Sequence, residues 1–211
     1  MATETEQRQQ QDTATDSRTR TMVPAVEEDT VLLARWLRRM PFAGDTFASS
    51  CRAIEAEPLP PINAKGGRDA EGWTAVYEVT VKPEWVNGMG GLHGAAAAWI
   101  VDMFTNTSIN RLATDTWNPW GPSINIEMNY YAPAMIGTRL RVETVIERMG
   151  ASISTCRCLV RCFVGELTQI SDATTGRRVA GGMHTTMRPA GRKHNPNILL
   201  LPERKKPFAK L

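Results

Sequence analysis

One acidic residue, Asp102, lies inside an apolar run between Gly94 and Phe104. A carboxylate among apolar neighbours is costly unless it is paired or used, and removal from water raises its pKa. Attack on an electrophile, as a base or as a nucleophile, is one use. An ion pair with an arginine such as Arg111 or Arg141 is the other. The residues around Asp102 decide between them.

Two residues stand where this run begins. Gly94 is predicted to start a helix, and its backbone N–H at the positive end of the helix dipole is suited to stabilise an oxyanion. Close packing is the alternative reason for a glycine there. His93 precedes the helix, where a hydrogen-bonded brace is the favoured interpretation and a general base the alternative.

Two further polar residues flank the run. Asn87 lies in the glycine-rich stretch NGMGG, where its carboxamide could donate to a substrate carbonyl or hold a water, or simply form a turn. Ser123 follows NPWGP and could fix a water or a carboxylate, or simply start a strand. The sequence lacks the GxSxG elbow, which argues against an α/β-hydrolase.

The spacing of Gly94 and Asp102 carries a quaternary inference. Eight residues on one helix correspond to about 12 Å along its axis. Both groups therefore cannot act on the same carbonyl within one chain. We expect two chains to share each site.

Periodicity predicts the elements that position these residues. A long helix over 94–111 has almost no polar face, which predicts that a sheet wraps it. An amphipathic helix is expected in 27–42, where Leu32, Leu33, Trp36 and Leu37 recur at helical spacing. Alternating segments predict five or six antiparallel strands. The clearest segments are 74–81, 123–131, 139–147, 154–164 and 179–187.

The 211 residues predict one domain with two tails. A disordered tail is expected over 1–26, the domain over 27–188, and a basic tail over 189–211. The sequence has no apolar run of about 18 residues, which argues against a membrane span. It also shows no secretory leader, which predicts an intracellular protein. The basic tail lacks a nucleic-acid recognition pattern, so no nucleic-acid partner is expected.

Three of the four cysteines share one strand. Cys156, Cys158 and Cys162 have the same parity and lie opposite Arg157 and Arg161. Small core residues are the favoured interpretation. A metal site would need a fourth ligand and usually a CxxC knuckle, and same-face neighbours on a strand are about as far apart as a disulfide allows. No metal is therefore expected.

The sequence resembles a known family through three stretches, NGMGGLHGAAAAWIVD, SINIEMNYYAPAMIGTRLRVETVIERMG and TTGRRVAGGMHTT, which fall between Ala75 and Met187. It looks like the hotdog-fold acyl-CoA thioesterases of the PaaI and thioesterase-superfamily-member-2 type. The resemblance implies an α+β hotdog fold, with an antiparallel five- to six-stranded sheet wrapped around a long central helix. It also implies homodimers or tetramers, and hydrolysis of acyl-CoA thioesters without metal or other cofactor.

The resemblance also implies roles for site residues. Asn87, His93 and Gly94 of one subunit are expected to face Asp102 and Ser123 of the other, and His93 to support the loop. With this pattern, catalysis is favoured over an ion pair at Asp102. A hotdog hydratase or dehydratase and a non-catalytic acyl-binding module remain as alternatives, as does a thioesterase of a secondary-metabolite pathway.

Recognition of coenzyme A is less evident. The family commonly has a basic residue where this sequence reads MGASIS, with Ala151. Arg148, Arg177 or Arg188 could replace it as substrate-binding residues, or the acyl group could arrive on a carrier protein.

The last three residues, Ala209, Lys210 and Leu211, resemble the S-K-L peroxisomal address. A peroxisomal import receptor is therefore an expected partner, and the expected location is peroxisomal, with a cytoplasmic location as the alternative.

Overall fold

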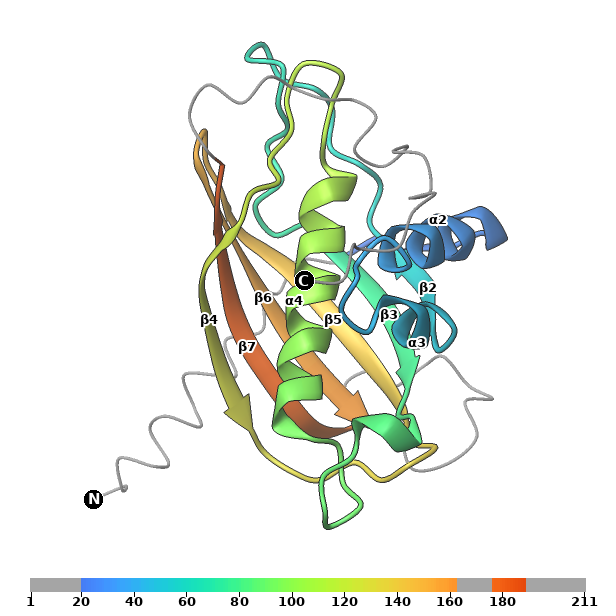
Figure 1. The fold of residues 1–211 in the computed structure, drawn as a ribbon. Coiled ribbons are helices and arrows are strands. Elements are labelled where there is room, and N and C mark those ends of the chain that lie inside the picture. The colour runs from blue at the N-terminus through green and yellow to red at the C-terminus, as the bar shows by residue number, and fades with distance from the viewer. Residues whose placement is uncertain (1–19, 163–175, 189–211) are drawn as a thin grey trace, which may run out of the picture.

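A seven-stranded antiparallel sheet with strand order β1-β2-β3-β5-β6-β7-β4 forms the body of the protein. The computed structural model describes residues 20–162 and 176–188. The strands are β1 (Val23–Pro24), β2 (Cys51–Ala56), β3 (Thr74–Thr80), β4 (Ser123–Tyr130), β5 (Arg139–Met149), β6 (Ile153–Cys162) and β7 (Arg177–Met187). The sheet curves behind one long helix, α4 (Gly94–Arg111), as Figure 1 shows. The predicted α+β architecture is confirmed.

The strand count exceeds the predicted five or six because β1 and β2 have weak sequence signals. β1 has only two residues, and pairs Val23 with Ala56. β2 carries an irregular register between Ala53 and Glu55, which interrupts its alternation. Residues 23 and 24, which the sequence placed in the N-terminal tail, thus belong to the edge of the sheet.

Helix α4 has the predicted bounds, and its inner face packs on the sheet. Ile100 and Phe104 are fully buried, and Phe104 stacks on Tyr77 of β3 with ring centroids 4.7 Å apart. Gly182 of β7 leaves room on this face: a Cβ there would clash with the Glu127 carbonyl oxygen of β4 and would lie 3.4 Å from the Val101 side chain of α4. The apolar character of the helix therefore reflects burial against a curved sheet.

Two helices cover the side of α4 near β2 (Figure 1): α2 (Glu27–Leu37) and the short α3 (Gly44–Ala48). α2 buries Leu33, Trp36 and Leu37 as predicted, but Leu32 is half exposed, and the helix ends before the predicted last turn. α2 is tied to the end of α4 by an ion pair between Asp29 and Arg111, 3.2 Å apart.

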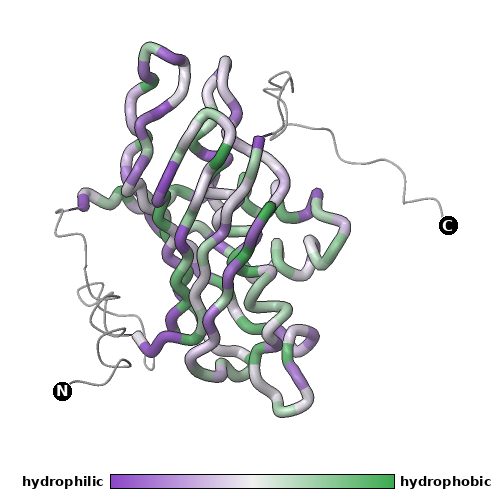
Figure 2. The backbone as a smooth tube through the Cα atoms, turned by 90° about the vertical axis from the view of Figure 1, so that its left-hand side faces the viewer, coloured by the Kyte–Doolittle hydropathy of each residue, from purple (hydrophilic) through white to green (hydrophobic). Residues whose placement is uncertain are grey.

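Hydrophilic and hydrophobic residues alternate along the strands in Figure 2, as a sheet with one covered face requires. β6 illustrates this: Cys156, Cys158 and Cys162 are buried free thiols, while Arg157 on the opposite face is exposed. The prediction that these cysteines are core residues is confirmed.

Two kinds of feature are absent from residues 20–162 and 176–188. No group of three His, Cys, Asp or Glu side chains there could hold a metal ion. No helix in this part is long and apolar enough to cross a membrane. Both expected tails beyond it, residues 1–19 and 189–211, lie outside the described residues.

Candidate active site

Asp102 lies in the middle of α4 and faces the first residue of β4. Its Oδ1 accepts a hydrogen bond from Asn106 Nδ2 at 2.8 Å and lies 3.3 Å from the Ser123 hydroxyl oxygen. Burial raises the pKa of Asp102, while the hydrogen bonds from Ser123 and Asn106 limit the rise. The structure thus brings together Asp102 and Ser123, which the sequence singled out separately.

Neither arginine considered as an ion-pair partner meets Asp102. Arg111 pairs with Asp29 of α2, and Arg141 pairs with Glu55 of β2. The polar neighbours of the Asp102 carboxylate are therefore a hydroxyl, an amide and an imidazole.

The imidazole belongs to His184 of β7, a residue that sequence reasoning did not select. His184 is fully buried. Its Nε2 lies 2.9 Å from Ser123 Oγ and 3.6 Å from Asp102 Oδ1, and its Nδ1 lies 2.5 Å from Thr105 Oγ1. Burial lowers the pKa of His184 from 6.5 to about 4, so the ring is neutral at pH 7.

The positions of the protons follow from the acceptors present. Thr105 Oγ1 lies 2.7 Å from the Val101 carbonyl oxygen, which cannot donate, so the Thr105 hydroxyl proton points there. His184 Nδ1–H must then donate to Thr105 Oγ1. Nε2 is left as an acceptor for the Ser123 hydroxyl, whose single proton is shared between His184 Nε2 and Asp102 Oδ1. His184 and Thr105 together orient the Ser123 hydroxyl.

This arrangement differs from a Ser–His–Asp triad. In a triad, a carboxylate on the far side of the imidazole stabilises the imidazolium that forms. Here the far side of His184 meets the neutral hydroxyl of Thr105. A ring with a pKa of about 4 is also a weak base. Ser123 is therefore suited to orient a water or Asp102, and Asp102 is the group suited to act as base or nucleophile.

The other predicted residues form a second group around the start of α4. His93 is the N-cap, where its Nδ1 accepts a hydrogen bond from the Ala95 N–H at 3.0 Å, as expected of a brace. Asn87 Oδ1 accepts from the Met89 and Gly91 N–H groups at 2.9 and 3.3 Å, so its carbonyl end shapes the loop and its amide nitrogen remains available to donate.

Gly94 begins α4, and its N–H belongs to the first turn, whose N–H groups have no partner within the helix. Its carbonyl accepts a hydrogen bond from the Tyr130 hydroxyl at 3.2 Å, at the end of β4 remote from Ser123. Along α4, Gly94 and Asp102 are separated by about 12 Å. One chain therefore presents two separate half-sites.

The stretch of the chain that carries these residues is similar to known proteins. Residues 89–168 match the family model of the Thioesterase superfamily, which spans the start of α4, Asp102 and Ser123. The predicted resemblance to the thioesterases is confirmed. Acyl-coenzyme A thioesterase 13 of Mus musculus and that of Homo sapiens are each 26% identical over 110 residues, 52% of this chain and 69% of the relative. Hydrolysis of a thioester is the corresponding class of reaction.

Solved structures share the fold of this thioesterase. Zebra fish thioesterase superfamily member 2 is 21% identical, with a TM-score of 0.53 over 77% of this chain and 99% of that chain. The E. coli PaaI protein from the phenylacetic acid degradation operon is 13% identical, with a TM-score of 0.53 over 79% of this chain and 98% of that chain. The predicted hotdog fold is confirmed.

The three arginines predicted to bind substrate do not form one cluster in this thioesterase. Arg177 starts β7 and donates to the Pro133 carbonyl oxygen at 2.8 Å. Arg188 follows the other end of β7, where its backbone N–H donates to Ser152. Arg148 lies near that same end, opposite Thr155. Arg177 thus lies at the end of the sheet that carries Gly94. Arg148 and Arg188 lie at the end that carries Ser123.

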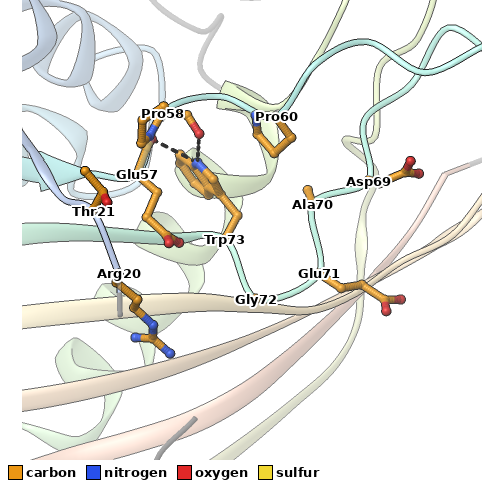
Figure 3. A pocket seen from close by; sticks show the side chains of 10 residues that line it. All are labelled: Arg20, Thr21, Glu57, Pro58, Pro60, Asp69, Ala70, Glu71, Gly72 and Trp73. Carbon is orange, nitrogen blue, oxygen red and sulfur yellow. Dashed lines mark hydrogen bonds between the residues drawn. The ribbon is translucent and has the colours of Figure 1, made fainter. Parts of the chain in front are cut away.

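A pocket of about 300 Å³ lies away from the residues discussed above, beside the loop that leads into β3. Its lining includes three carboxylates, Glu57, Asp69 and Glu71, and one cation, Arg20 (Figure 3). The Trp73 indole N–H is already bonded to the carbonyl oxygens of residues 57 and 58. This acidic lining does not suit the phosphates of coenzyme A.

Proposed function

We propose that the protein hydrolyses acyl-CoA thioesters to the free acid and coenzyme A, without a metal, at sites shared between two subunits. The observation that carries the proposal is Asp102, a carboxylate whose pKa is raised by burial and which lies 3.3 Å from an oriented Ser123 hydroxyl. A raised pKa makes a carboxylate a stronger base near neutral pH.

In the proposed reaction, Asp102 takes a proton from a water as that water attacks the thioester carbonyl carbon. Alternatively, the carboxylate attacks directly to form a mixed anhydride, which a water then hydrolyses to the free acid and the regenerated carboxylate. Ser123, held by His184, accepts a hydrogen bond from the water or steadies the carboxylate. Negative charge grows on the carbonyl oxygen, and the Gly94 N–H and the Asn87 amide of a second subunit stabilise it. The C–S bond then breaks and the thiolate leaves with a proton.

Exposure of β4 supports the shared site. β4 is the last strand of the sheet, and a second copy could extend the sheet by pairing there. Ile124 and Tyr130 on this strand are 51% and 58% exposed, and Met135 and Ile136 just beyond it are each 52% exposed. An apolar sheet edge beside both half-sites is the surface that a homodimer would cover.

The cations available for phosphate groups bear on which thiol carries the acyl group of the substrate. Ala151 supplies no cation, so the proposed phosphate contacts fall to Arg177, Arg148 and Arg188, of which Arg148 and Arg177 are exposed. An acyl carrier protein is the second candidate donor, because carrier thioesters expose the same reacting carbonyl and need fewer phosphate contacts. Comparing one acyl group on the two donors separates the candidates.

The test is release of free thiol from a panel of acyl-CoA thioesters, followed with a thiol-reactive dye. The described cysteines of the protein are buried, so they should add little signal. Asp102→Asn keeps the size and removes the base, and should lower kcat by about a hundredfold or more.

The matched control is Asp115→Asn, the same change at an exposed residue beyond α4, which should retain the activity of the unmodified protein. Equal turnover in Asp102→Asn and Asp115→Asn would contradict the role of Asp102. A hydratase would change the acyl chain without releasing thiol, and an acyl-binding module would do neither.

The proposed location is the peroxisome, through recognition of Ala209, Lys210 and Leu211 by an import receptor, with the cytoplasm as the alternative. These residues lie outside the described part of the chain, and the proposal rests on the sequence alone.

A further inference from the structure

A polar stripe extends from Asp102 along one face of α4. Asn106 and Asn110 follow Asp102 at four-residue steps, and each step turns about 40° around the helix. The three side chains therefore share one face. Phe104 and Ser108, which pack against β3 and β5, lie on the opposite face.

Two amide atoms in this stripe are buried without a partner. Asn106 is 6% exposed, and its Nδ2 donates to Asp102, but its Oδ1 has no hydrogen bond. Asn110 is 3% exposed, and its Nδ2 has no hydrogen bond. A buried polar group without a partner costs about 1–3 kcal/mol. Helix interiors also disfavour asparagine. Two such residues on one face therefore require an explanation.

Thr186 adds a third buried polar atom near the same carboxylate. Its Oγ1 also has no partner, and the residue is fully buried. In the sheet Thr186 pairs with Ser123, which contacts Asp102. Three of the unpartnered buried atoms thus lie near the reacting group, on the side that leads toward the end of α4.

We propose that Asn106 and Asn110 bind a hydroxyl group carried by the acyl chain of the substrate. This inference rests on the proposed thioesterase function. Asn106 Oδ1 needs a donor and Asn110 Nδ2 needs an acceptor, and a hydroxyl supplies both. The two residues lie about 6 and 12 Å beyond Asp102 along the helix axis. That reach places the hydroxyl near the far end of a medium-length acyl chain.

The chemistry of the site then selects between acyl groups. A plain alkyl chain would cover both amide atoms and leave them unpaired, whereas a hydroxylated chain would satisfy them. Sites built to bond a hydroxyl reject analogues that lack it much more strongly than apolar pockets reject an added methylene. A buried water bonded to both amides is the competing explanation, and would give no preference between the two acyl groups.

The experiment compares 8-hydroxyoctanoyl-CoA with octanoyl-CoA. The unmodified protein should hydrolyse the hydroxylated thioester with a kcat/KM at least about tenfold higher, the effect of one to two hydrogen bonds. Asn110→Leu, which does not touch Asp102, should abolish the preference by slowing the hydroxylated substrate. Thr107→Val is the matched control, since Thr107 is buried on α4 but its hydroxyl already bonds the Met103 carbonyl oxygen.

Binding measurements keep this test separate from the proposed function. Thioether analogues of both substrates, in which a methylene replaces the reacting carbonyl, can be titrated by calorimetry into the full chain. Tighter binding of the hydroxylated analogue, lost in Asn110→Leu, supports the inference whether or not any thioester is hydrolysed. Equal affinities, or a preference that Asn110→Leu leaves intact, overturn it and leave a water as the partner of both amides. Absence of thiol release from every acyl-CoA would count against the proposed function instead.

Discussion

The buried imidazole of His184 predicts a specific loss of stability in acid. Its pKa in the folded protein is about 4, against 6.5 for an ordinary histidine, because burial disfavours the charged ring. Between these two values the unfolded chain binds a proton at His184 that the folded chain does not. Stability contributed by the neutral ring is therefore complete above pH 6.5, declines as the pH falls below it, and is fully lost below about pH 4.

The size of the loss follows from the same two values. Their difference corresponds to roughly 3 kcal/mol between pH 7 and pH 4. A loss of this size is a large fraction of the stability of an ordinary domain. His184→Asn removes the titrating group, so the free energy of unfolding of this variant should lack that part of the pH dependence, although the variant is less stable than the unmodified protein at pH 7.

The assay is urea unfolding followed by tryptophan fluorescence at fixed protein concentration, across this pH range. Asp102 titrates beside His184, and its raised pKa acts in the opposite direction, because the folded chain then holds a proton that the unfolded chain releases. Both proteins are therefore compared also in an Asp102→Asn background, where only His184 differs. A stability difference between the proteins that is the same at pH 7 and pH 4, or a His184 NMR titration midpoint near 6.5, would refute the reasoning.

Two further outcomes test the quaternary and cellular proposals. Mixing an Asn87→Ala, Gly94→Pro chain with an Asp102→Asn, Ser123→Ala chain, each inactive alone, should restore up to about a quarter of full activity, because half of the exchanged dimers are mixed and each has one intact site; no recovery despite verified exchange would exclude a shared site. A fluorescent protein fused to the N-terminus should give peroxisomal puncta that disappear on deletion of Ala209–Leu211, whereas a diffuse signal from the intact fusion would reject the peroxisomal proposal.

The central helix was predictable to its end residues because its signals are local. An apolar run follows His93 and Gly94 directly, and the cap and the burial pattern both lie within the helix itself. The neighbourhood of Asp102 was predictable only in part. Ser123 came from the resemblance to a family, since 21 positions of sequence separate it from Asp102.

His184 was missed because its role depends on pairings between distant segments. It reaches Ser123 only because β7 pairs with β4, and it reaches Thr105 only because α4 crosses the same strand. Sequence parity could have placed His184 on the inner face of its strand, but not beside a particular hydroxyl. Likewise, the spacing of Asn106 and Asn110 from Asp102 is visible in the sequence, whereas their lack of partners depends on what packs around them.

Burial shifts the pKa of both Asp102 and His184, with different consequences for each. Burial raises the pKa of Asp102 and lowers that of His184, so it favours the neutral form of each. For Asp102 this desolvation increases basicity, and the hydrogen bonds from Ser123 and Asn106 keep the ionised form within reach. For His184 it removes basicity, so that above about pH 4 the ring stays neutral and its Nε2 remains an acceptor beside the Ser123 hydroxyl. We infer that His184 acts by position and not by proton transfer. The fall in the rate of thioester hydrolysis at acid pH should then reflect the protonation of Asp102 alone. In the His184→Asn variant the midpoint of this fall should stay at the same pH, although the rate itself is lower.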